Sequence, residues 1–147
     1  MGFREEFERA ADAAVRIDFT DTVAAGDINV FETTIRYLGG YLAAYDLSGD
    51  ARLLRKAREV GDLLYKAFDT PNRMPITRWD LRAARRGTRQ AEAPGSALLA
   101  EVGSFALEFT RLSILTGDPR WYDAAERIRE LLEAQQESTK LPGRSAN

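Results

Sequence analysis

An internal repeat limits the possible folds of this 147-residue chain more than any other feature. The segment LSGDARLLRKA (47–57) is similar to LTGDPRWYDAA (115–125), at an offset of 68 residues. Each copy comes after an apolar helical stretch. It consists of a Gly-Asp turn and the start of a helix that has one charged face. Units of this kind cover one another's apolar faces, as in a solenoid or a closed α/α toroid. The repeat therefore predicts stacked helical hairpins.

The apolar spacing predicts an all-α protein of about five helices, with no β-sheet running through the helical spans. Helices near 30–47 and 97–115 are apolar on most sides, so we expect them to form a buried inner layer. Helices near 51–67 and 119–135 carry many charges and are expected in the outer layer. The first helix, near the N-terminus, is amphipathic. A long loop is predicted for residues 69–96, where proline, glycine and arginine are frequent.

The composition excludes several kinds of site. The chain has no cysteine and no histidine, which rules out His-based zinc sites, Ser-His-Asp triads and disulfides. With 21 basic and 23 acidic residues the net charge is −2, so nucleic acid is not an expected partner. No apolar run is long enough for a transmembrane helix. Any chemistry must therefore use carboxylates, hydroxyls, arginine and lysine.

Carboxylates near the starts of the two inner helices are the candidate functional groups. Glu32 and Arg36 are four residues apart, which on a surface helix indicates an ordinary ion pair. Glu32 precedes Asp50 of its turn by 18 residues, and Glu101 precedes Asp118 by 17. In a toroid both carboxylates would then lie at the same mouth, roughly 6–12 Å apart. Two carboxylates at one mouth are a recurring feature of glycoside hydrolases.

Several separated motifs resemble those of the class I α-1,2-mannosidases, glycoside hydrolase family 47, and in their order they match its fungal branch. These motifs are INV (28–30), FETTIRYLGGYLAAYDLSGD (31–50), AFDTPNRMPITRWD (67–80), LLAEVGSFALEFTRLSILTGDPRWYDA (98–124) and QESTKLPG (136–143). The resemblance implies part of an (α/α)7 barrel. It also implies a Ca²⁺-dependent, inverting enzyme that trims α-1,2-linked mannose from high-mannose N-glycans, in the secretory pathway or secreted.

The resemblance assigns roles to three residues. Glu32 corresponds to a catalytic carboxylate of the family, usually the general acid. Arg36 corresponds to the arginine that contacts the sugar and orients the acid. Glu101 corresponds to a glutamate that lines the substrate site. The family's other two catalytic carboxylates and its Ca²⁺-binding threonine have no counterpart here, so we expect residues 1–147 to be an incomplete fragment of one catalytic domain, inactive alone.

Two other functions remain open from the sequence: a lectin-like module that binds mannose glycans, and a helical-repeat interaction scaffold. An arc cut from a toroid is also expected to leave apolar side chains of the inner helices uncovered, namely Tyr37, Tyr41, Phe105 and Phe109. Trp121 is expected to serve packing, whereas Trp79 is equally consistent with packing and with stacking on a sugar. Gly39 and Gly40 within a helix indicate close approach of a neighbouring helix or of a sugar.

Overall fold

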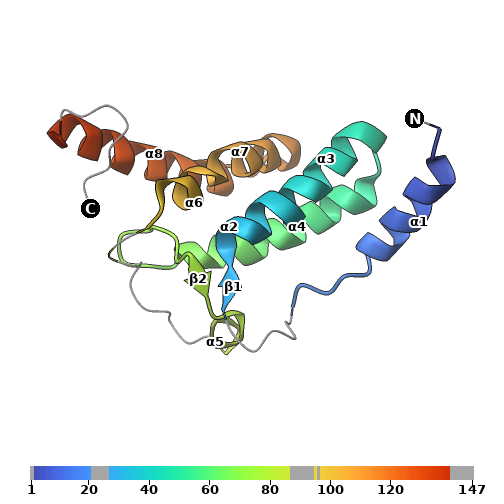
Figure 1. Ribbon diagram of the computed structural model, residues 1–147, viewed down its shortest axis with the longest axis horizontal. Coiled ribbons are helices and arrows are strands. Elements are labelled where there is room, and N and C mark those ends of the chain that lie inside the picture. Colours follow the sequence, from blue (N-terminus) through green and yellow to red (C-terminus); the bar gives the residue numbers. More distant parts are fainter. Residues whose placement is uncertain (1, 21–26, 87–94, 96, 140–147) are drawn as a thin grey trace.

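Two helical hairpins account for most of the chain in the computed structural model, which describes residues 2–20, 27–86, 95 and 97–139 (Figure 1). In the first hairpin, α2, the π-helix η1 and α3 continue one another and α4 returns. In the second hairpin, α6 and α7 lead into α8. The bounds are Val30–Thr33 for α2, Thr34–Leu38 for η1, Gly39–Ser48 for α3, Ala51–Tyr65 for α4, Leu99–Gly103 for α6, Phe105–Thr116 for α7 and Arg120–Thr139 for α8. The predicted all-α fold is confirmed.

The turn inside each hairpin has the same geometry. Gly49 and Gly117 have φ angles of 71° and 72°, in the left-handed region where a side chain is disfavoured. The next residue caps the returning helix. Asp50 accepts a hydrogen bond from the backbone N–H two residues later at 2.9 Å, and Asp118 accepts the equivalent bond at 3.2 Å. The Gly-Asp pair of the repeat is therefore the element that reverses the chain.

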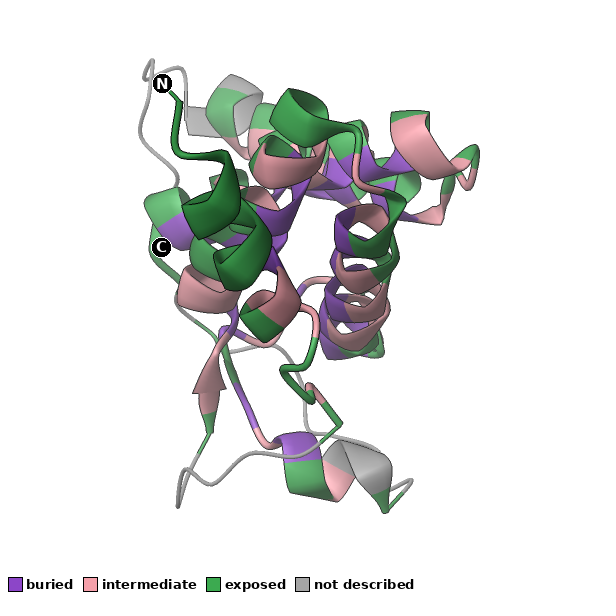
Figure 2. Cartoon of the chain, turned by 90° about the vertical axis from the view of Figure 1, so that its right-hand side faces the viewer, coloured by how far each residue is buried: buried purple, intermediate pink, exposed green. Residues whose placement is uncertain are grey.

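The core lies where the two hairpins meet, and α4 packs against both α7 and α8. Gly61 of α4 makes this close approach possible. A Cβ atom at Gly61 would lie 2.3 Å from Cδ2 of Leu112 and 3.2 Å from Nε1 of Trp121, both of which are completely buried. Figure 2 shows the buried faces of the helices turned toward one another in the interior. Trp121 therefore serves packing, as predicted.

The segment predicted as one long loop contains regular structure. Strand β2 (Arg78–Trp79) pairs antiparallel with β1 (Ile28–Asn29), and a short helix α5 (Leu81–Arg85) follows. The backbone N–H of Val30 also donates to the carbonyl of Thr77 at 3.1 Å, which extends the pairing to the start of α2. Two-residue strands are too short for a period-two pattern, so the sequence does not reveal them.

Helix α1 (Arg4–Ala14) lies beside the first hairpin, near the turn that joins α3 to α4 (Figure 1). Its buried residue is Ala11. Two polar contacts attach it. The hydroxyl of Tyr41 donates to the carbonyl of Ala14 at 2.7 Å, and Arg52 Nη1 bonds Asp12 Oδ1 at 2.7 Å. Helix α1 is thus held by a few contacts at the edge of the fold.

The prediction of which apolar residues are uncovered is mostly wrong. Tyr37 is 45% exposed, but Tyr41, Phe105 and Phe109 are buried. The rings of Phe105 and Phe109 pack on Phe68, with centroid distances of 5.1 and 5.6 Å. The uncovered side chains are others, with exposed fractions of 90% for Leu47, 79% for Leu107 and 66% for Ile114. A helix that is apolar on most sides does not show in sequence which side is covered.

Two helix boundaries also differ from the prediction. The inner helix expected near 97–115 begins at Leu99 and is interrupted at Ser104, between α6 and α7. The outer helix expected to end near 135 continues to Thr139. None of the helices in the described part of the chain has the length and apolarity needed to cross a membrane.

Candidate functional site

Glu32 lies in the first turn of α2, which Asn29 caps. The backbone N–H of Glu32 donates to Asn29 Oδ1 at 3.1 Å. Arg36 Nε donates to Glu32 Oε2, and the exposed fractions of the two side chains are 70% for Arg36 and 41% for Glu32. The pair is therefore a solvated i,i+4 ion pair, accessible from outside and of small energetic value by itself.

The π-helix η1 lies between Glu32 and the Gly-Asp turn that follows it, where the first inner helix is one residue longer than the second. Counted back from the aspartate of the turn, Glu32 is one residue farther away than Glu101. A π turn takes up one residue more than an α turn, and η1 (Thr34–Leu38) lies between Glu32 and its turn. The extra residue is thereby absorbed inside the helix. Such π turns occur often at functional sites, and nothing in the composition of this segment reveals one.

Glu101 lies in the first turn of α6 and is largely buried. Its side chain is 11% exposed, and its Oε1 accepts a hydrogen bond from Arg78 Nη2 at 2.8 Å. The Arg78 side chain is 51% exposed. Sequence reasoning missed Arg78, because it is separated from Glu101 by 23 residues and no periodic pattern links the two.

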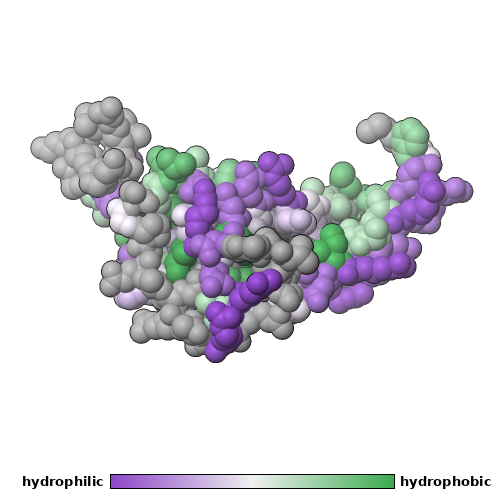
Figure 3. Space-filling model, turned by 60° about the horizontal axis from the view of Figure 1, so that its bottom comes forward, coloured by the Kyte–Doolittle hydropathy of each residue, from purple (hydrophilic) through white to green (hydrophobic). Residues whose placement is uncertain are grey.

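The short β ladder brings the two carboxylates to the same part of the fold. In the ladder Asn29 is paired with Arg78. Asn29 caps the helix that carries Glu32, and Arg78 bonds Glu101. On the face that carries β1, β2 and α5, hydrophilic residues gather across the middle of the molecule (Figure 3). A direct contact between Glu32 and Glu101 is not among the hydrogen bonds and ion pairs of the described residues.

A third carboxylate, Glu108 of α7, lies at the contact between the inner helices. Its Oε1 is 3.1 Å from the position of a Cβ atom on Gly39, so this glycine admits the neighbouring side chain as predicted. Its Oε2 is buried and has no hydrogen-bond partner among the described residues. Burial raises the pKa of the Glu108 carboxyl. A glutamate on a mostly apolar helix is the sequence signal for this position.

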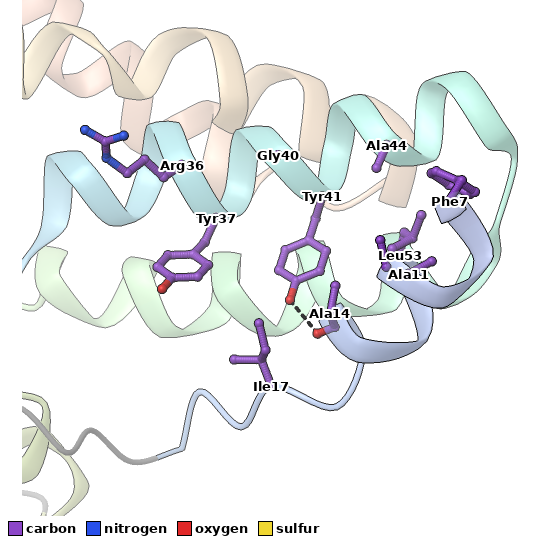
Figure 4. Close-up of a pocket in the computed structure, with 11 residues that line it drawn as sticks. Phe7, Ala11, Ala14, Ile17, Arg36, Tyr37, Gly40, Tyr41, Ala44 and Leu53 are labelled. Carbon is purple, nitrogen blue, oxygen red and sulfur yellow. Dashed lines mark hydrogen bonds between the residues drawn. The ribbon is translucent and has the colours of Figure 1, made fainter. Parts of the chain in front are cut away.

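Two further features do not belong to a polar site. Trp79 is completely buried, so it packs in the core and is not available for stacking on a sugar. A cavity of about 280 Å³ lies between α1 and the first hairpin, lined mainly by apolar residues such as Phe7, Tyr37 and Ala44. In Figure 4 the guanidinium of Arg36 points away from this cavity. Neither Glu32 nor Glu101 lines it.

The carboxylates of the described residues are too scattered to serve together as a calcium site. Ca²⁺ in proteins takes six to eight oxygen ligands, with carboxylates prominent among them. Within the described ranges no group of three or more His, Cys, Asp or Glu side chains is placed to hold a metal ion. The described residues therefore do not fit a calcium site.

Comparisons with known proteins agree with this architecture. Residues 1–147 match the model of glycosyl hydrolase family 47. The chain is 40% identical to a mannosyl-oligosaccharide 1,2-α-mannosidase of Arabidopsis thaliana over 129 residues, 87% of this chain and 22% of that protein. It is 41% identical to the endoplasmic reticulum mannosyl-oligosaccharide 1,2-α-mannosidase of Homo sapiens over 134 residues, 88% of this chain and 18% of that protein.

A solved structure is similar as well. The α-1,2-mannosidase from Trichoderma reesei superposes with a TM-score of 0.71 at 34% identity, covering 85% of this chain and 28% of that one. The chain thus spans between 18% and 28% of the length of these proteins. The expected fungal branch is not confirmed, since plant and human relatives are as similar. The family is shown by the match over all 147 residues: the chain belongs to glycosyl hydrolase family 47.

Proposed function

We propose that this chain supplies part of the sugar site of a mannosyl-oligosaccharide 1,2-α-mannosidase that trims high-mannose N-glycans in the secretory pathway or outside the cell. The observation that carries the proposal is the linkage of two helix starts. The cap of the helix bearing Glu32 is paired with Arg78, and Arg78 bonds Glu101. The printed names of the relatives supply the substrate class.

In this proposal Glu32 is the general acid that protonates the leaving glycosidic oxygen. Its carboxyl is accessible, as an acid that meets an outside substrate must be. Arg36 is more exposed still and is placed to donate to sugar hydroxyls and to orient Glu32. Glu101, largely buried, accepts hydrogen bonds from the hydroxyls of the bound mannose. Inversion requires in addition a base on the opposite side of the sugar, about 6.5–9.5 Å from the acid.

We infer that the 147-residue chain does not hydrolyse glycans on its own. One acid without a matching base loses about 10²–10⁴-fold per missing positioned group. For the whole enzyme we also propose the calcium dependence that the family resemblance implies. The carboxyls of Glu32 and Glu101 are proposed to lie roughly 6–12 Å apart.

The experiment separates binding from hydrolysis. The purified chain is incubated with α-1,2-linked mannobiose and Ca²⁺, and free mannose and bound disaccharide are both measured. We expect weak binding, with a Kd on the order of 1 mM or above, that is lost in Glu101→Gln, and no release of mannose. Mannose release that Glu32→Gln abolishes would contradict the inferred inactivity. Binding that Glu101→Gln leaves unchanged would contradict the assigned site.

A further inference from the structure

We propose that Arg78 is a sugar-positioning residue, which holds Glu101 in its binding orientation and donates directly to a sugar hydroxyl beside it. This inference rests on the proposed function, which assigns sugar binding to Glu101 but gives Arg78 no part in it.

Arg78 connects the two hairpin starts, with its guanidinium bonded to the second and its backbone paired with Asn29 before the first. Its Nη2 donates to Glu101 Oε1 at 2.8 Å, at the start of α6. Its Nη1 donates to the carbonyl of Thr77 at 3.1 Å. The same carbonyl accepts the backbone N–H of Val30, the first residue of α2, at 3.1 Å. Arg78 therefore fixes the starts of α2 and α6 relative to one another at the end where Glu32 and Glu101 lie.

The two hydrogen bonds of the Arg78 guanidinium leave other N–H donors of the group able to bind a ligand. A guanidinium carries five N–H donors, and the described residues accept hydrogen bonds from two of those of Arg78. The side chain is 51% exposed, whereas its partner Glu101 is 11% exposed. A charge-assisted bond to a carboxylate with little water around it is stronger than a solvated ion pair. The exposed donors are thus held in a defined direction.

The chemistry of the pair suits a carbohydrate. Each sugar hydroxyl both donates and accepts hydrogen bonds, and neighbouring hydroxyls on a pyranose present two such groups side by side. A carboxylate offers only acceptors and a guanidinium only donors. Glu101 and Arg78 together therefore match two adjacent hydroxyls of one mannose residue, with Glu101 accepting from one and Arg78 donating to the other.

Arg111 provides the structural comparison. It also joins the hairpins through a carboxylate, with Nη2 bonded to Asp46 Oδ1 at 2.7 Å. Both partners of that pair are exposed, at 44% and 37%. Arg111 lies in the middle of α7 and Asp46 in the last turn of α3, at the end of the first inner helix opposite to the β ladder. A purely structural role for an arginine between the hairpins predicts the same consequence for the loss of Arg78 and of Arg111.

The test uses the full 147-residue chain and α-1,2-linked mannobiose, titrated by ligand-observed NMR. Arg78→Met keeps most of the apolar stem and removes the donors, and we expect it to weaken binding about tenfold or more. Arg78→Lys keeps a charge and one donor for Glu101 but not the planar fork, and we expect a loss of about threefold. Arg111→Met is expected to bind as the unsubstituted chain does. Thermal unfolding of each variant reports whether the fold is retained.

The outcomes separate this inference from the proposed function. If the unsubstituted chain shows no mannobiose binding, the proposed function fails and this inference fails with it. If Glu101→Gln abolishes binding while Arg78→Met binds normally, only the role of Arg78 is overturned. If Arg78→Met does not fold, Arg78→Lys decides, because unchanged or tighter binding by that variant contradicts the inference. Equal losses in Arg78→Met and Arg111→Met would also overturn it, since they indicate a structural effect.

Discussion

The returning helices of the two hairpins, α4 and α8, can be compared residue by residue at the offset of 68. Their buried side chains then fall at matching positions. Leu53 of α4 corresponds to Trp121 of α8, and Val60 corresponds to Ile128. All four are buried. The turn residues match as well. Within this frame one position differs sharply, because buried Gly61 corresponds to Arg129, which lies in solvent.

Gly61 and Arg129 differ because different helices pack against α4 and α8 at these two positions. Helix α4 has α7 and α8 pressed against the side where Gly61 lies, so a side chain there has no room. At the equivalent place on α8, Arg129 bonds Glu126 and Glu133 of its own helix. The repeat unit thus sets which residues face the partner helix of the same hairpin. Contact with the next hairpin sets the rest.

The starts of the hairpins differ in exposure. The first hairpin begins with a side-chain cap from Asn29 and presents an accessible Glu32, and it contains the π turn. The second begins without a side-chain cap, at Leu98, and presents a largely buried Glu101. The first-turn glutamates of the two hairpins therefore differ, because Glu32 is accessible to solvent and Glu101 is largely buried and bonded to Arg78.

The largest expected difference in the free energy of unfolding is between substitutions on the covered side of α7 and substitutions on its uncovered side. Phe109→Ala removes a completely buried ring that packs on Phe68 and Phe105, and large-to-small changes of this kind cost about 3–5 kcal/mol. Leu107→Ala changes a side chain that is 79% exposed and should alter the free energy of unfolding by less than about 0.5 kcal/mol. Urea denaturation measures both. Similar losses for the two variants would mean that α7 packs with a different side inward.

The comparison of Gly61 with Arg129 is tested by the same substitution at both. Gly61→Val places methyl groups where Leu112 already lies, and overpacking of this kind should lower the free energy of unfolding by about 3 kcal/mol. Arg129→Val loses only solvated ion pairs and should leave the urea midpoint close to its original value. A stable Gly61→Val variant would show that α4 does not approach α7 as closely as described.

A smaller effect is expected at the helix starts. Asn29→Ala removes the side-chain cap of α2 and should cost about 1 kcal/mol. Leu98→Ala is the matched change at the start of α6, where no side chain caps the helix and Leu98 is 67% exposed. That variant should unfold at the same urea concentration as the unsubstituted chain. Equal stability of both variants would remove the distinction between the two starts.

The smallest expected effect is on how the stability of the chain depends on pH, through Glu108. Burial raises the pKa of Glu108 in the folded state above its ordinary value of 4.5. In the range between the two values the folded state binds more protons than the unfolded one, so stability falls as pH rises through that range. Glu108→Gln should flatten this fall. The stability of the variant relative to the unsubstituted chain should therefore be greater at pH 7 than at pH 4.5. Urea midpoints measured across this range check the slope, and an unchanged slope would mean that Glu108 is solvated.

The sequence predicts the features that depend on local pattern. The repeat, the Gly-Asp turns, the hairpins and the i,i+4 pair of Glu32 with Arg36 all follow from spacing. The features that depend on distant contacts do not. The ladder of β1 with β2 is too short to show a period, and the bond from Arg78 to Glu101 joins separate elements. The covered side of α7 cannot be read from a helix with apolar residues on most sides.

We propose that the two hairpin starts form one sugar-binding surface. Titration of α-1,2-linked mannobiose into the ¹⁵N-labelled chain, followed by backbone amide shifts, tests it most directly. If the hairpin starts do form one surface, the amides around Glu32, Arg78 and Glu101 shift together along one binding curve. Shifts confined to the apolar cavity beside α1, or two groups of amides with separate binding curves, would contradict it.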